Sequence, residues 1–593
     1  MNWLRKTHGV FFELVRHFLR RMLDGEWSSS PGQWSSAAIG LVSLFLPAGL
    51  LLVREGAADP KYASRYRLLA MAADHAGLRA AAIADETALI TLISCVAGLL
   101  ALLQWQSMFP SQRDFLAMAS LPVRPRQIFA ARFTAVLLFS TLVIAAMNLL
   151  PSLIAPIEFG GGWQLDSAFA AHALAQAISS CAACFFVFFA ILAIQGILLN
   201  LLPANLCARV SLYVQGLLAG VFLLGGFYSW SMKEWTPATI AALPQFGAWL
   251  PPVWFTGLHQ SLTGAASHET SPFFAAMAQR ALLAAGIAVA LSAVTYLLSY
   301  RRYRKLLLES PVRVAISSAW RSRLLRVLAG SPRREAIICF LAQTLVRSRT
   351  HRLMWFVYIG AAAAVMLNSS IIDGALFVRS QGWVKALRFL VQFWPLACSV
   401  VILSGFRHVL SIPAELRANW IFQITESQGR AEWMSAVERF VMAWAVVPIY
   451  LVLVPVAAYV LGWAVACRLA ILQLLITLCL FELLFNSWQK LPFTCSYIPG
   501  KRPLVAVVGG YIAVLCGIMP ILSGMIAASS VFAPLFPFYL VDFAAIWLWL
   551  RRQRREGWGE AKLIYEDVPA VVTDLGIKDI SSVGQALPPA NPA

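Results

Sequence analysis

Few residues in the sequence have the type and spacing that catalysis needs. Cys181 and Cys184 form a CxxC pair, but no second pair or nearby histidine completes a zinc or redox site. The His-Glu pair at 268–269 lacks the second histidine of a zinc-protease helix, and the Gly-Lys pair at 500–501 lacks the other residues of a phosphate-binding loop. No GxSxG nucleophile motif occurs. The sequence therefore predicts no catalytic centre, no metal site and no bound cofactor.

One acidic side chain, Glu482, lies inside an apolar run at 478–484. A charged side chain at the centre of a membrane costs on the order of 3 kcal/mol, so such residues are commonly paired or functional. Two interpretations stay open. Glu482 contacts a substrate or a proton within the membrane, or it lies near a helix end, close to Asn486 and Gln489, and extends to the lipid headgroups.

Two amphipathic segments, at 111–132 and 415–439, are the strongest candidates for contact with a partner. Each has exposed apolar side chains, such as Phe115 and Met118 in the first and Trp420 in the second, and each is interrupted by a turn. These patterns predict two helix–turn–helix hairpins at the membrane surface. Ordinary cytoplasmic loops are the alternative, but the equivalent placement of both segments favours docking sites for a cytoplasmic protein.

The composition requires a membrane to position these segments. Of 593 residues, 60% are hydrophobic and 13% are charged, whereas soluble domains average about 25% charged residues. Apolar runs of about 20 residues cross a bilayer as helices, and these runs lack the alternation of barrel strands. We therefore predict an all-α polytopic membrane protein with about twelve transmembrane helices. The spans are expected near 34–53, 87–108, 133–154, 172–200, 210–229, 276–299, 353–367, 389–406, 440–463, 469–487, 504–528 and 532–550.

Lysine and arginine residues indicate the orientation of these spans. The loops at 153–170 and 230–273 contain only Lys233 between them, whereas basic clusters lie at 301–352 and 551–555. Because positive residues stay on the cytoplasmic side, both termini are expected in the cytoplasm, with the protein in the cytoplasmic (inner) membrane. The net charge of +19 then reflects topology and attraction to the lipid bilayer. No nucleic-acid partner is expected, because the basic residues are spread over many loops.

The two halves of the chain carry similar features in the same order. Each half has an Arg-Phe pair where its third span begins (132–133 and 439–440) and a Leu-Pro pair after its fourth span (202–203 and 491–492). Since six is an even number of spans, this order predicts two parallel six-helix repeats. The expected parts are an N-terminal interfacial amphipathic helix (1–33), a first six-span unit (34–300), a basic cytoplasmic linker with an amphipathic helix (301–351), a second six-span unit (352–550) and a poorly ordered cytoplasmic tail (551–593).

This order of elements resembles the permease subunit of type-2 ABC exporters. The run SLPVRPRQIFAARF at 120–133 is similar to the LP-x-x-x-x-Q phrase of such permeases, and the resemblance covers most of the chain. It implies an ATP-driven export system in which this chain is not an enzyme and a cytoplasmic ABC-type ATPase subunit, in two copies, hydrolyses ATP. It also implies that the Trp- and Pro-rich loop at 231–273 caps the transport path, with a tryptophan belt at the membrane interface as the alternative.

The resemblance implies that the loop after the second span of each unit contacts the ATPase. The second hairpin departs from the family by lacking the Leu-Pro pair of the first. The implied coupling residues are Asp114, Phe115, Met118, Leu121, Arg124 and Arg126 in the first hairpin, and Glu415, Arg417, Trp420 and Glu426 in the second.

Two other function classes fit parts of the sequence. An ion-coupled secondary transporter would use ionisable residues within the membrane, of which Glu482 is nearly the only one in the predicted spans. A membrane-embedded lipid-linked sugar transferase would use acidic residues in the first outer loop, but the basic residues of that loop favour a solvated helical excursion. The acidic residues concerned are Asp59, Asp74, Asp85 and Glu86. The transported substrate stays unknown, because an apolar path fits many substrates equally.

Overall fold

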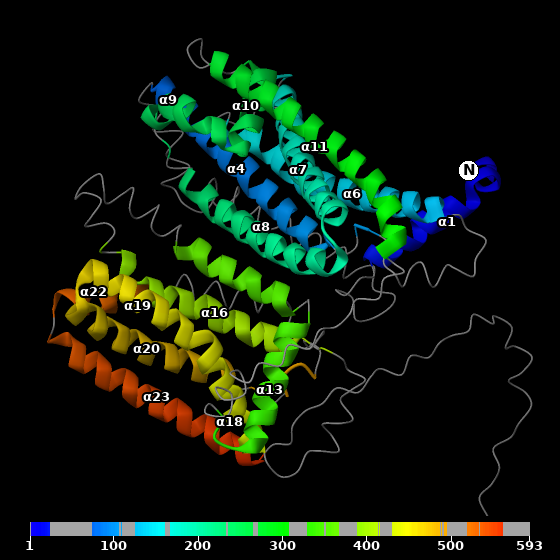
Figure 1. Ribbon diagram of the computed structural model, residues 1–593. Helices are drawn as coiled ribbons and strands as arrows, with labels where there is room; N and C mark the ends of the chain where they lie inside the picture. The colour runs from blue at the N-terminus through cyan, green and yellow to red at the C-terminus, as the bar shows by residue number, and fades with distance from the viewer. Residues whose placement is uncertain are drawn as a thin grey trace, which may run out of the picture.

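All regular secondary structure in the described part of the chain is helical. The computed structural model describes residues 2–23, 74–105, 108–109, 125–159, 167–232, 235, 237–264, 271–306, 329–348, 351–366, 388, 390–412, 414, 430–486, 488, 491–494, 519–532 and 534–560. Within these ranges the helices form two groups, one from each half of the chain (Figure 1). The all-α prediction is confirmed for this part of the protein.

Eight of the described helices are long and apolar enough to cross a membrane, judged by length and composition. They fall on predicted spans two to six and eight to ten, so the chain is compatible with a multi-pass membrane protein. Their apolar cores are His75–Leu102, Arg126–Pro156, Phe169–Leu201, Val210–Ser229, Ser271–Ser299, Trp394–Ser411, Ala431–Leu461 and Trp463–Phe485.

The other four predicted spans are not among these eight helices. The span at 34–53 lies outside the described residues, and most of the span at 504–528 does too, although α22 (Met519–Val531) covers its end. The span at 353–367 corresponds to an apolar but shorter helix, His351–Met366. The span at 532–550 falls within α23 (Leu535–Glu560), which is not one of the eight. Twelve spans therefore stay a prediction.

The first group of helices is arranged around α7, which contacts α4, α6, α10 and α11. Its fit against α11 depends on a small residue, because Gly196 lies directly against Thr295. Asn200 strengthens the same contact by donating hydrogen bonds of 2.9 Å to the Thr295 carbonyl and the Ser299 hydroxyl. The helices of this group are α1 (Asn2–Leu23), α4 (His75–Leu103), α6 (Pro125–Phe159), α7 (Ser167–Leu201), α8 (Ala204–Met232), α9 (Pro237–Phe246), α10 (Pro251–Thr263) and α11 (Ser271–Leu306).

The helix is interrupted between α7 and α8 at Leu202-Pro203, where the Leu-Pro pair predicts the end of the fourth span. The helix α1 lies near the start of α6, whereas α9 and α10 lie at the opposite end of the group (Figure 1). We refer to these ends as the α1 end and the α10 end.

The second group of helices is arranged around α20, which contacts α16, α19 and α23. The helix α18 continues into α19 through a π-helical turn at Met442–Val446, just before Pro448. A wider turn accommodates a proline, which has no N–H to donate to the helix. The helices of this group are α13 (Pro332–Arg347), α16 (Trp394–Ser411), α18 (Arg430–Val441), α19 (Val447–Leu461), α20 (Trp463–Phe485), α22 and α23.

The two groups meet where α8 crosses the helix His351–Met366. A Cβ atom built on Gly360 would lie 2.8 Å from the Cα of Gly220, and one built on Gly216 would lie 2.9 Å from the Cβ of Phe356. In a membrane, small residues of this kind let helix backbones approach closely, which strengthens van der Waals packing where no hydrophobic force acts between helices. The glycines on both helices are therefore a requirement of this contact.

Substituting Gly360→Ala should destabilise the protein, because the added Cβ would meet backbone atoms that cannot move aside. Overpacking of this kind costs about 1–3 kcal/mol. The apparent unfolding temperature in detergent should fall. Gly286→Ala is the matched control, since nothing lies within 4 Å of the Cβ that it would add to α11, and it should not lower that temperature, because alanine is also the better helix former. An equal effect of both substitutions would contradict the close crossing.

Candidate coupling helices and buried ionic clusters

Most of the predicted coupling residues fall outside the described residues, so their prediction is neither confirmed nor contradicted. Arg126 is the exception: it lies in the first turn of α6, and its side chain is exposed. The predicted residues outside the described ranges are Asp114, Phe115, Met118, Leu121, Arg124, Glu415, Arg417, Trp420 and Glu426.

The helix α6, which begins within the first predicted hairpin and continues into the third predicted span, is packed against α1. Phe18 of α1 is fully buried and joins Ile128 and Ala131 of α6 in one apolar cluster. Arg132 is 5% exposed, and its guanidinium carbon lies 5.0 Å from the centre of the Phe18 ring. Such a cation–π contact is stronger when the cation is removed from water. Arg132 therefore links the start of α6 to the amphipathic N-terminal helix.

The helix α18, which forms the second arm of the second predicted hairpin, is packed against α13 in a corresponding way. Arg439 donates a 2.9 Å hydrogen bond to the carbonyl of Ala329, just before α13 begins. At the surface, Arg333 of α13 lies 3.7 Å from Glu432 of α18. Arg132 and Arg439 occupy equivalent positions in the predicted duplication, and each connects its helix to the amphipathic helix of its own half.

Glu482 belongs to a buried ionic cluster that joins three helices. Arg554 of α23 lies between two carboxylates, 2.7 Å from Glu438 of α18 and 2.5 Å from Glu482 of α20. Arg551 extends the cluster, at 3.4 Å from Glu438. The guanidinium of Arg554 also lies 4.9 Å from the centre of the Phe481 ring. The two acidic and two basic groups balance each other, as buried charges require.

This cluster shows what the Glu482 side chain contacts in the protein. The side chain is 2% exposed and faces Arg554, so it is paired inside the helix group. From the sequence alone, the arginines at 551–555 indicate only the orientation of the last predicted span. The sequence did contain a signal for an ion pair: a lone acidic residue in an apolar run, together with an arginine cluster at the end of a later helix. Buried carboxylates are commonly paired with cations.

A second buried carboxylate, Glu86, lies near the α10 end. The expectation that Asp85 and Glu86 lie in a solvated excursion is wrong, because α4 begins at His75 and both side chains are buried, at 8% and 2% exposed. His259 of α10 lies 2.7 Å from one carboxylate oxygen of Glu86, and Gln260 donates a 2.8 Å hydrogen bond to the other. Sequence reasoning missed this pair because the two residues are far apart in the chain.

The other acidic residues of the predicted first outer loop offer little support for a transferase site. Asp74 caps the N-terminus of α4, where its side chain accepts a 2.8 Å hydrogen bond from the backbone N–H of Gly77. This is a structural use of the carboxylate. Asp59 lies outside the described residues.

The predicted capping loop contains a short buried helix. Two prolines at the first turn start α10, where their missing N–H groups are not needed, and Gly264 with φ 64° ends it. Trp249, just before it, is 85% exposed, whereas Trp235 and Phe255 are buried. α10 packs against α4, α7 and α11. Part of the loop therefore inserts into the helix group instead of lying on its surface.

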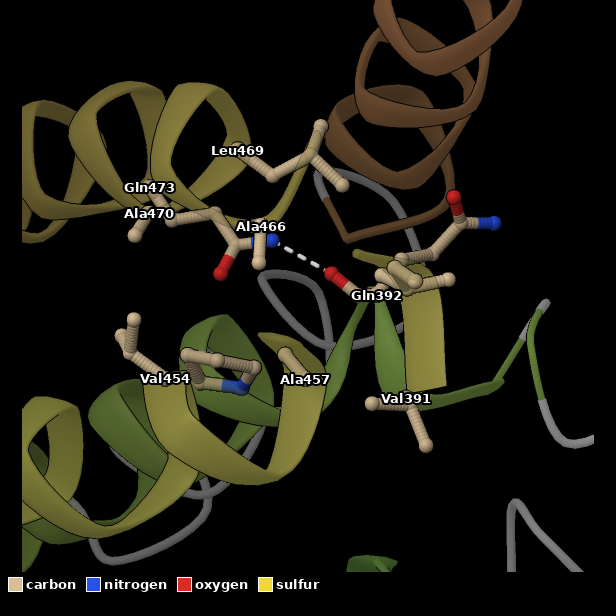
Figure 2. Close-up of a pocket in the computed structure, with 10 residues that line it drawn as sticks. Val391, Gln392, Val454, Ala457, Ala466, Leu469, Ala470 and Gln473 are labelled. Carbon is tan, nitrogen blue, oxygen red and sulfur yellow. Dashed lines mark hydrogen bonds between the residues drawn. The ribbon is translucent and has the colours of Figure 1, made fainter. Parts of the chain in front are cut away.

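The second group contains a small pocket between α16, α19 and α20 (Figure 2). Gln473 donates a hydrogen bond to the backbone carbonyl of Gln392 across it, and apolar side chains such as Val391, Val454 and Leu469 form the walls. Its volume of about 10 Å³ is at the lower limit for a single water molecule. It is a packing gap crossed by a polar contact, too small for a substrate.

No protein-family model, curated protein or solved structure matches the chain. Its function is therefore inferred from its own residues and their arrangement.

Substituting Arg554→Met should destabilise the protein strongly, because it leaves Glu438 and Glu482 buried without their shared cation. Breaking a buried ion pair from one side costs about 3–5 kcal/mol. The midpoint of unfolding in detergent mixtures should fall accordingly. Adding Glu482→Gln to Arg554→Met should recover part of the loss, and Arg552→Met, at an exposed neighbouring position, should have no effect. A double variant no more stable than Arg554→Met would contradict the assigned pair.

Proposed function

We propose that the protein is the transmembrane permease of an ATP-driven ABC export system. It would lie in the cytoplasmic membrane with both termini in the cytoplasm, and a separate cytoplasmic ATPase subunit, in two copies, would hydrolyse ATP. The observation that carries the proposal is the matched pair of helices that contain the second arms of the two predicted hairpins. α6 and α18 each begin within a predicted hairpin, and each is linked to an amphipathic helix through the basic residue at the end of that hairpin, Arg132 or Arg439.

The order of helix neighbours supports two parallel repeats. In the first group, α1 contacts α6, α6 contacts α7, and α7 contacts α11. In the second group, α13 contacts α18, α19 contacts α20, and α20 contacts α23. These are the contacts expected if α1, α6, α7 and α11 correspond to α13, α18–α19, α20 and α23. In the proposed topology, α1 and α13 both lie on the cytoplasmic side, where the basic clusters gather.

In the proposed mechanism, the ATPase moves the two hairpins and the helices that follow them. In the second half, Glu438 near the end of α18 would pass this motion to α20 and α23, because Arg554 joins all three helices. The first half would respond through α6 and its contacts with α1, α4 and α7. The crossing of α8 and the helix His351–Met366 is where one half would move against the other, giving alternating access to a path between them.

The buried pair Glu86–His259 favours an ion-coupled secondary transporter as the second candidate. Ionisable residues within a membrane helix often form proton or ion pathways, and this pair adds to Glu482 as a buried acidic site. Substrate uptake into vesicles driven by a pH gradient, without ATP or an ATPase, would favour this candidate over the ABC permease.

Capture of the tagged protein from native membranes should recover an ATPase subunit with a phosphate-binding loop. Phe115→Ala and Trp420→Ala should each weaken this association, because an aromatic residue at a docking surface contributes much of the binding free energy of that surface. The recovered ratio of ATPase to permease should fall several-fold while the amount of permease in the membrane is unchanged.

Trp249→Ala is the control for this experiment, since it removes an exposed tryptophan at the α10 end, away from the proposed docking surface. It should leave the ratio unchanged. Capture without any ATPase would count against the ABC assignment. Unchanged association of the Phe115→Ala and Trp420→Ala variants would count against the hairpins alone.

A further inference from the structure

The polar contact between α10 and α4 occupies both oxygens of one buried carboxylate. His259 and Gln260 of α10 each approach one oxygen of Glu86, at 2.7 and 2.8 Å. One turn earlier, Thr256 donates a 3.1 Å hydrogen bond to the hydroxyl of Thr87. Glu86 is 2% exposed, and the His259 side chain is 9% exposed. The charge of Glu86 is therefore stabilised by α10, and α10 is held on this side by Glu86.

On its other side, α10 packs closely against α11. A Cβ on Gly257 would lie 2.6 Å from the Cβ of Met277 and 2.7 Å from the carbonyl of Phe274. The helix has only 13 residues, and isolated helices of this length are marginal in water. Its position therefore depends on contacts with its neighbours, and the Glu86 contact is the one whose strength varies with protonation.

We propose that Glu86 and His259 form a proton-dependent latch: the ion pair between the carboxylate and the protonated imidazole holds α10 against α4, and loss of the imidazolium proton to solvent releases that hold. The latch acts on the α10 end alone and does not depend on what drives transport. Its consequence is a segment whose closure over the first helix group is held while the imidazole of His259 is protonated beside the ionised carboxylate, and weakens as the pH rises and the imidazole loses its proton.

The charged and titratable groups on the helices packed against α10 agree with this assignment. Asp85 and Glu86 come from α4, His172 comes from α7 with its ring centre 6.0 Å from that of His259, and Arg280 comes from the first turns of α11. Arg280 is exposed and reaches toward the carbonyl of Ala248 at 3.5 Å. Glu86 is thus the carboxylate placed to pair with the imidazole.

The direction of the pH effect follows from the surroundings of His259. Burial lowers the pKa of the imidazole, but the charge and hydrogen bond of Glu86, helped by the backbone at His172, outweigh burial and raise the pKa above the usual 6.5. A group whose pKa is raised in the folded state stabilises it fully below the unfolded value. That stabilisation is lost as the pH rises through the folded value. Release is therefore expected above pH 6.5, on the alkaline side.

A cysteine at position 256 would report release of the helix. Thr256→Cys is close in size, and the native side chain is fully buried between α10 and α4. The full-length protein in lipid nanodiscs would be treated with a soluble maleimide, and labelling of the peptide containing position 256 would be followed by mass spectrometry. Trp249→Cys, at an exposed position nearby, supplies the labelling rate of a free cysteine at each pH, because thiolate content itself changes with pH.

The ratio of the two rates should rise between pH 6.5 and pH 8.5, by at most about tenfold per pH unit, since release of one proton cannot change an opening equilibrium more steeply. With Glu86→Gln added, the ratio should no longer rise with pH, because no ion pair can form and burial alone lowers the pKa of the His259 imidazole. With His259→Lys, the cation persists across this range and position 256 should stay protected at pH 8.5.

Two results would overturn the latch. One is a ratio that does not change with pH in the Thr256→Cys protein. The other is a rise of the ratio with pH that persists in the presence of Glu86→Gln or His259→Lys. If the Glu86→Gln protein does not fold, the labelling ratio of the His259→Lys protein alone tests the latch. None of these outcomes depends on an ATPase, so they leave the proposed ABC permease untouched.

Discussion

A charge removed from water must meet an opposite charge, and this constraint fixes the arrangement of helices at both ends of the protein. The desolvation of an ion in a helix interior costs several kcal/mol unless a partner compensates for it. Arg554 meets this requirement for Glu438 and Glu482, and His259 meets it for Glu86. Apolar helix faces alone fit together in many registers. The paired charges select one register, because only one brings each carboxylate to its cation.

Away from these charges, close packing of small residues supplies the remaining specificity. Lipid is as apolar as leucine, so burying one apolar helix face against another gains little. Gly196 against Thr295 and Gly220 against Gly360 bring helices close enough for extensive van der Waals contact. The first contact lies within one group of helices and the second joins the two groups. The ion pairs thus join helices within each group, whereas the small residues act both within a group and between the two groups.

The sequence predicts the local features well and the pairings poorly, for a physical reason. Long apolar runs must form helices in lipid, and prolines end them, so the helical class and the break at Leu202-Pro203 could be predicted. Hydropathy does not say which helices are neighbours, and the partners of Glu482 and Glu86 therefore came only from the structure. The expectation that Glu86 lies in a solvated loop is wrong because the charged residues in the first turns of α4 give that part of the helix the composition of a loop. Of the predicted coupling residues, Arg126 alone lies in the described part, where it is exposed.

The crossing of α8 with the helix His351–Met366 has a mechanical consequence. Where two helices meet through interlocking side chains, each knob sits in a hole and resists rotation. At Gly220 and Gly360 backbone faces backbone, so no side chain separates the two helices at that point. One turn earlier the Phe356 side chain lies against Gly216. The contact therefore holds the two halves of the chain at the separation of their backbones, and a tilt of one half against the other has to displace Phe356.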